Sequence, residues 1–100
     1  MKVRIQKHGR TYYTFYCPGC NDSHMINDTW GFNGDVDKPT FTPSVFVHGH
    51  KRHEQPDSPD CHSFVTDGQI QFLGDSTHAL AGQTVPLPNV PVDKMPTIAQ

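Results

Sequence analysis

Apolar side chains are scarce in this sequence, which limits what hydrophobic burial can contribute to its stability. Only 34% of the 100 residues are hydrophobic, and the mean hydropathy is −0.60. A chain of this length is enough for one domain, which buries only roughly 60–65% of the surface that its unfolded form exposes. We therefore expect residues 1–100 to form a single domain that draws part of its stability from another source than its core.

Long apolar runs and clusters of positive charge are also missing. No run approaches the ~20 residues of a membrane-spanning helix, and the segment from Met1 to Gln6 lacks the apolar core of a signal peptide. The net charge is −2, the pI is about 6.3, and the basic residues cluster no further than the pair Lys51-Arg52. We therefore expect a cytoplasmic protein without a broad nucleic-acid-binding surface.

Sequence motifs of the common enzymes are absent as well. The chain has no nucleophile elbow, no phosphate-binding loop and no pair of carboxylates at a defined spacing. Its only glutamate is Glu54, in a polar segment with two prolines, so the acid that a zinc deaminase uses as proton shuttle has no clear candidate. This pattern favours a protein that is not an enzyme.

The three cysteines are an odd number, which does not suit a disulfide framework. Cys17-Pro18-Gly19-Cys20 is a C-x2-C zinc knuckle, in which two thiolates bind one ion across a tight turn. A thioredoxin-like redox pair is the alternative, but no βαβ pattern surrounds these residues and no helix follows Cys17. The spacing therefore predicts a metal site.

A structural zinc ion takes four Cys and His ligands. Cys61 is the remaining cysteine and the natural third ligand, and three histidines compete for the fourth place. His78 ranks first, because the strand pairing described below brings its segment near Cys61. His24 ranks second, and His62 third because it points to the opposite face of its strand from Cys61. The predicted site is thus Zn²⁺ held by Cys17, Cys20, Cys61 and His78. Such an ion contributes roughly 10–16 kcal/mol of apparent binding free energy, which exceeds the net stability of a typical domain, roughly 5–15 kcal/mol.

The fold class indicated by the sequence is mostly β: a small zinc-stabilised antiparallel domain with at most one short helical turn. Segments rich in Thr, Tyr, Phe, Val and Ile have high strand propensity. The expected strands span residues 3–5, 11–16, 25–32 and 40–47, and Pro43 marks an edge or a bulge in the last of them.

The clearest element is a hairpin from Cys61 to Leu73. Asp67-Gly68 fits the two central positions of a type I′ turn, which needs positive φ at both. That turn sets the register and places alternate residues on opposite faces. The predicted pairs are Val65 with Ile70, Ser63 with Phe72 and Cys61 with Gly74. The residues predicted on the face of Cys61 are Ser63, Val65, Ile70 and Phe72.

Beyond the hairpin, Thr77 to Gln83 is the one plausible helical turn, with Gly82 as its stop. Residues 86–100 contain four prolines and are expected to form an extended tail.

Two further groups of residues could carry chemistry. His48, His50 and His53 could chelate a metal, although a solvated loop is the simpler interpretation. The aromatic residues between Tyr12 and Phe46 could form a binding surface, but aromatics that alternate on strands more often belong to a core.

Several longer motifs resemble a family of small phage and prophage proteins of unknown function. The motifs are Cys17-Pro18-Gly19-Cys20 with His24, Trp30 to Gly34, Pro39 to Ser44, Cys61 to Leu73 and His78 to Val85. Some members carry the label ammonia monooxygenase, which a chain of this length without membrane spans does not fit. The resemblance implies a phage-encoded accessory protein in a bacterial cytoplasm, and it brings no catalytic residues with it.

Three functions follow from these observations. The first is a zinc-stabilised phage protein that binds a host protein and modulates or inhibits it, for example in a defence system such as CRISPR. The second is a small metal-dependent enzyme, such as a hydrolase, that uses His24, His62 or His78 around an open metal. The third is a nucleic-acid-binding zinc module that uses Lys51, Arg52 and the aromatic residues.

Overall fold

A computed structural model describes residues 1–47 and 60–91 of the chain. Within these ranges the protein consists of strands, turns and irregular segments and has no helix, which confirms the predicted β class. No helix long and apolar enough to cross a membrane occurs in the part of the chain that is described. The strands are β1 (Arg4–His8), β2 (Arg10–Cys17), β3 (Asp22–Asn27), β4 (Gly31–Phe32), β5 (Phe41–Thr42), β6 (Val45–Val47), β7 (Cys61–Thr66), β8 (Gln69–Phe72) and β9 (Thr84–Pro86).

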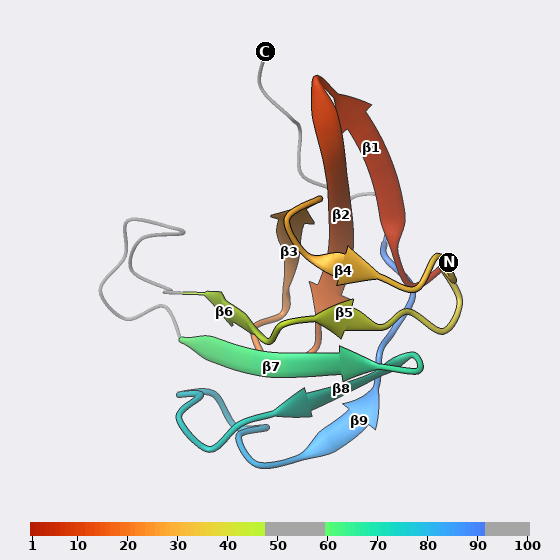
Figure 1. Ribbon diagram of the computed structural model, residues 1–100. Coiled ribbons are helices and arrows are strands. Elements are labelled where there is room, and N and C mark those ends of the chain that lie inside the picture. Colours follow the sequence, from red (N-terminus) through yellow and green to blue (C-terminus); the bar gives the residue numbers. More distant parts are fainter. Residues whose placement is uncertain (48–59, 92–100) are drawn as a thin grey trace.

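These strands form three antiparallel sheets, ordered β1-β2-β3, β4-β5 and β6-β7-β8-β9. In Figure 1 the long strands β1 and β2 run transverse to the strands of the four-stranded sheet, and the short pair β4-β5 lies between the two. The carboxyl end of β2 points toward the four-stranded sheet. The C-x2-C turn that follows β2 therefore lies where the sheets meet.

The amino-terminal sheet begins with a hairpin of β1 and β2, which turns at Gly9 with φ 77°. The expected single strand over residues 25–32 is instead two, β3 and β4. The Asn27 side chain accepts hydrogen bonds from the backbone N–H and the hydroxyl of Thr29. Such a side-chain turn competes with strand pairing and ends β3.

The expected strand over residues 40–47 is likewise divided, with Pro43 between β5 and β6. β5 pairs with β4, whereas β6 pairs with β7 of the four-stranded sheet. The break at Pro43 therefore lets one stretch of chain serve two sheets.

The β7-β8 hairpin has the predicted register, with Ser63 opposite Phe72 and Val65 opposite Ile70. Asp67 and Gly68 have φ values of 49° and 77°, as a type I′ turn requires. Side chains on the face of Cys61 are buried and the alternate ones are more exposed. The predicted pairing of Cys61 with Gly74 does not occur, because β8 ends at Phe72.

The segment after β8 forms successive turns in place of the expected helical turn. The backbone N–H of Ala81 donates to the carbonyl of His78, and that of Gln83 to Leu80. β9 then pairs with β8, so regular structure extends to Pro86, the first residue of the expected tail. Residues 92–100 of that tail lie outside the described ranges.

The core joins the sheets through aliphatic, aromatic and sulfur side chains. Its buried members are Val3, Phe15, Cys17, Ile26, Phe41, Val45, Cys61, Val65, Ile70, Phe72 and Leu87. Two of the three cysteines therefore belong to the interior, where their sulfur atoms could serve as metal ligands.

Candidate metal centre and catalytic triad

Three cysteines and one histidine meet where β2, β3 and β7 converge. One ligand atom from each of Cys17, Cys20, His24 and Cys61 lies within 4.8 Å of all the others. Cys17 ends β2, Cys20 lies in the turn after it, His24 is on β3, and Cys61 opens β7. The backbone N–H of Cys20 donates to the Cys17 sulfur at 3.4 Å, as in a zinc knuckle. The structure thus brings together the three predicted cysteines.

The spacing of the sulfurs fits a metal centre and not a disulfide. The Sγ atoms of Cys17 and Cys61 are 3.7 Å apart, and all three cysteines are free thiols. A disulfide has an S–S length of about 2.05 Å. Two sulfurs bound at about 2.3 Å to one tetrahedral ion lie about 3.8 Å apart. The observed separation corresponds to the second arrangement.

The thiols also influence one another's protonation. A hydrogen bond with the Cys20 sulfur, together with burial, raises the pKa of Cys17 to about 12. Hydrogen bonding to Cys17 likewise raises the pKa of Cys61, while hydrogen bonds from both neighbours lower the pKa of Cys20. Without a cation the three thiols therefore do not ionise independently of one another. A bound divalent cation deprotonates the thiols that coordinate it.

His24 completes the group. Its side chain is only 2% exposed, and neither ring nitrogen has a hydrogen-bond partner among the described residues. Buried polar atoms in proteins are nearly always paired. A metal ion would satisfy one of these nitrogens, so the unpaired ring is a second observation that points to an ion.

His78, ranked first from the sequence, is not a member of this group, and its place is taken by His24. The His78 ring packs edge-on against Phe72, with ring centroids 4.5 Å apart, and its Nδ1 accepts the Leu80 N–H at 3.2 Å. A Cβ added at Gly19 would collide with this ring. His78 therefore packs against the C-x2-C turn, with its buried Nε2 unpaired among the described residues, and its ring explains why a glycine is needed at position 19.

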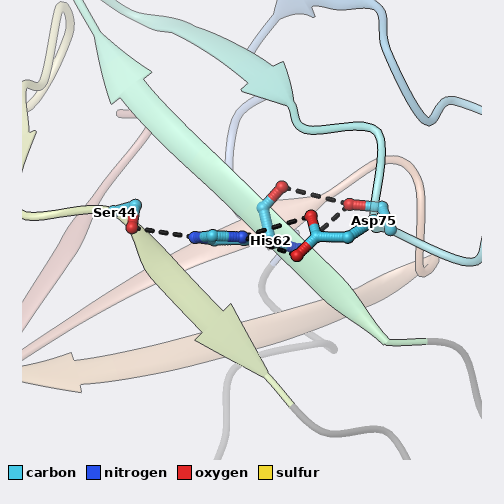
Figure 2. Close-up of polar contacts among 4 residues, drawn as sticks. Ser44, His62 and Asp75 are labelled. Carbon is cyan, nitrogen blue, oxygen red and sulfur yellow. Dashed lines mark hydrogen bonds and ion pairs between the residues drawn. The ribbon is translucent and has the colours of Figure 1, made fainter.

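His62, ranked third, also lies outside the metal group, and it belongs to a second constellation. Its Nε2 lies at hydrogen-bond distance, 2.9 Å, from the Ser44 hydroxyl oxygen. Its Nδ1 lies 3.0 and 3.2 Å from the two carboxylate oxygens of Asp75. Figure 2 shows the imidazole between the serine and the aspartate, which come from separate segments of the chain. This order of contacts is that of a Ser-His-Asp triad, in which the carboxylate fixes the tautomer and the free nitrogen faces the hydroxyl.

Backbone contacts hold the triad together. The indole of Trp30 donates to the Ser44 carbonyl at 3.4 Å. The hydroxyl of Ser76, which is buried, accepts the His62 N–H and donates to the His62 carbonyl, both at 3.0 Å. Because Ser76 follows Asp75 directly, this pair of bonds fixes the aspartate beside the imidazole.

The two constellations share strand β7. Cys61 and His62 are neighbours in the chain, and successive side chains of a strand point to opposite faces. The sulfur of Cys61 therefore lies in the interior with the metal group, while His62 lies on the outer face with Ser44 and Asp75.

Sequence reasoning did not find the triad. Ser44 follows Pro43 and has none of the glycines of a nucleophile elbow. The one available signal was the hairpin register, which placed His62 on the face away from the cysteines. The string His48, His50 and His53, the pair Lys51-Arg52 and Glu54 lie outside the described residues.

Comparison with protein families gave a match. The family model described as bacterial ubiquitination-like system serine protease (BubE) matches residues 1–73. The matched range contains the whole metal group together with Ser44 and His62, and it ends just before Asp75. Neither the curated proteins nor the solved structures yielded a match.

Proposed function

We propose that this chain, which belongs to the family of bacterial ubiquitination-like system serine proteases (BubE), cleaves a peptide bond in a protein of such a system. The observation that carries the proposal is the hydrogen-bonded sequence of Ser44, His62 and Asp75 on the outer face of the four-stranded sheet. A serine hydroxyl is a weak nucleophile unless a neighbouring base takes its proton. His62 supplies that base at hydrogen-bond distance.

The reaction follows from the contacts of the three side chains. Ser44 Oγ attacks the carbonyl carbon of the scissile bond while His62 Nε2 takes the hydroxyl proton. The imidazolium then gives this proton to the leaving amine, and the acyl group stays on Ser44 as an ester. His62 next deprotonates a water molecule, which attacks the ester, releases the acid and restores the Ser44 hydroxyl.

Asp75 acts mainly by orienting the imidazole. Its side chain is 57% exposed, whereas that of His62 is 24% exposed. Solvent weakens the attraction between a carboxylate and an imidazolium at so open a site. The hydrogen bond to Nδ1 still selects the tautomer that leaves Nε2 free to accept the Ser44 proton.

The metal group has a structural role in this proposal, and the ion is zinc. Three thiolates and the His24 imidazole are four ligands, which is the complete tetrahedral shell of a structural zinc site. A catalytic zinc keeps one position for water. The nucleophile therefore comes from Ser44, and the ion supports the strand that carries His62.

A fluorophosphonate probe tests the nucleophile without knowledge of the substrate. Zinc-loaded protein should gain one adduct, which mass spectrometry of its peptides locates at Ser44. Ser44→Ala and His62→Ala should lose the adduct, whereas Thr11→Ala, which removes a hydroxyl in the other large sheet, should keep it. Folding of each variant is checked by its thermal transition. A folded wild type that gains no adduct, or equal labelling of Ser44→Ala, would contradict the proposal.

The other functions inferred from the sequence stay predictions. Family membership brings neither a phage origin nor binding to a host defence complex with it, and no observation on the described residues favours nucleic acid. The sequence favoured a protein that is not an enzyme because the common enzyme motifs are missing. The contacts of His62 with Ser44 and Asp75 instead support an enzyme.

A further inference from the structure

We propose that Phe46 and Phe64 form the wall of a substrate subsite, which receives a large apolar side chain of an extended polypeptide next to its scissile bond. The inference rests on the proposed protease function, since it describes how that active site selects its substrate. It concerns two residues on the outer face of the four-stranded sheet that the chemistry itself does not use.

Both phenylalanines flank the catalytic histidine. Phe46 lies directly across from His62 in the β6-β7 pairing, and the two rings meet edge to face with centroids 5.1 Å apart. Phe64 is two residues beyond His62 on β7, so it shares the same face. The imidazole is thus bordered by a phenyl ring across the sheet and by another along its own strand.

Their exposure is unusual for this protein. The chain has six phenylalanines, and the other four are buried or half-buried. Phe46 is 41% and Phe64 39% exposed. The two phenylalanines with the largest exposed fractions therefore both adjoin the base of the triad. An exposed aromatic pair beside a reactive group is typical of a surface that contacts an apolar partner.

A shallow hollow continues from Phe64 along the sheet. It has a volume of about 290 Å³ and is lined by Phe64, Thr66, Asp67, Gln69, Gln71 and Thr84. Pockets that enclose whole small ligands have volumes of roughly 300–1,000 Å³, so this open hollow suits a side chain better than a cofactor. Its hydroxyl and amide groups can hydrogen-bond to the backbone of a bound chain.

The spacing along the strand fixes which substrate residue would reach the wall. Val45 pairs with Ser63, so Ser44, which precedes Val45, falls beside Phe64 in the continuation of that register. An extended chain advances about 3.3 Å per residue, so a substrate with its scissile carbonyl at Ser44 would bring a side chain within two residues of the cut against Phe64. The occupant is therefore an extended peptide segment with a large apolar residue near that position.

The test measures cleavage of internally quenched peptide libraries in which one position at a time is fixed as Leu, Phe, Ala or Asp. Wild type should prefer Leu or Phe over Ala by about 10-fold or more in kcat/KM at one position within two residues of the cut. Phe64→Ala should remove most of this preference, with Phe64→Leu intermediate. Phe46→Ala should lower it as well. The matched control is Met25→Ala, which removes a 40%-exposed apolar side chain from the other large sheet.

Labelling of Ser44 by the small fluorophosphonate probe separates the two proposals. If the probe labels Ser44 at equal rates in wild type and Phe64→Ala while the preference changes, the subsite is supported. If labelling occurs but the preference is absent or survives Phe64→Ala, or no library peptide is cleaved, the subsite is refuted and the nucleophile stands. A dimer in sedimentation that Phe46→Ala or Phe64→Ala converts to monomer would also refute it, since the rings would then cover a second copy. Without any labelling the protease function itself fails.

Discussion

Replacing His24 by alanine should remove the metal ion and most of the stability of the protein. A structural zinc contributes roughly 10–16 kcal/mol of apparent binding free energy, against a net stability of roughly 5–15 kcal/mol for a typical domain. His24 is one of four ligands and is 2% exposed, so its loss opens the shell and leaves a cavity in a sparse core. We expect His24→Ala to bind less than one zinc per chain and to unfold at 25 °C or close to it.

His78→Ala is the matched control, because this histidine packs against the C-x2-C turn from outside the ligand group. It should retain one zinc per chain and lose about 1–3 kcal/mol, the cost of a half-buried side chain that contacts Phe72 and Gly19. The assay combines elemental analysis of the purified proteins with urea unfolding followed by circular dichroism, in excess zinc and in excess chelator. A metal-free wild type that unfolds cooperatively with the same midpoint in chelator would show that no ion stabilises the protein. The choice of His24 as the ligand would be refuted if His78→Ala lost the zinc and His24→Ala kept it.

Two further predictions follow from individual contacts. Asp75→Asn should lower the fluorophosphonate labelling rate and the kcat for peptides by about 10²-fold. This loss is smaller than the ~10⁴-fold known for a buried triad aspartate, because Asp75 is 57% exposed. An unchanged rate in the folded variant would exclude Asp75 from the triad. Gly19→Ala should destabilise the protein by about 2 kcal/mol or more through collision with the His78 ring. In urea unfolding, the double variant with His78→Ala should recover most of this loss. If the effects of the two substitutions on stability simply add, the ring is not the cause.

The local elements could be predicted from the sequence alone. Asp67-Gly68 sets a type I′ turn through its own backbone preferences, and that turn alone fixed the register and the buried face of the β7-β8 hairpin. The C-x2-C turn is equally local, since two thiolates three residues apart meet whatever surrounds them. Cys61 could be predicted as the third ligand because it is the one remaining cysteine.

The identity of the fourth member of the metal group depends on how strands β2 and β3 pair. From the sequence alone, a strand that begins near His24 could carry this residue away from Cys20. β3 in fact pairs with β2 from Cys17 opposite Asp22 onward, so His24 lies across from Phe15 and faces the interior. Which histidine closes the group is set by that sheet register, and the spacing of residues along the chain does not specify it.

The triad was decided by tertiary structure to the greatest extent. Ser44 and His62 meet because β6 pairs with β7 across a long connection, and Asp75 reaches Nδ1 because Ser76 bonds to the His62 backbone. The sequence by itself determined a β protein with a metal-binding turn and a well-registered hairpin, since each depends on neighbouring residues. The alignment of hydroxyl, imidazole and carboxylate was decided only in the folded chain, because pairings between distant segments have no signature in the order of residues.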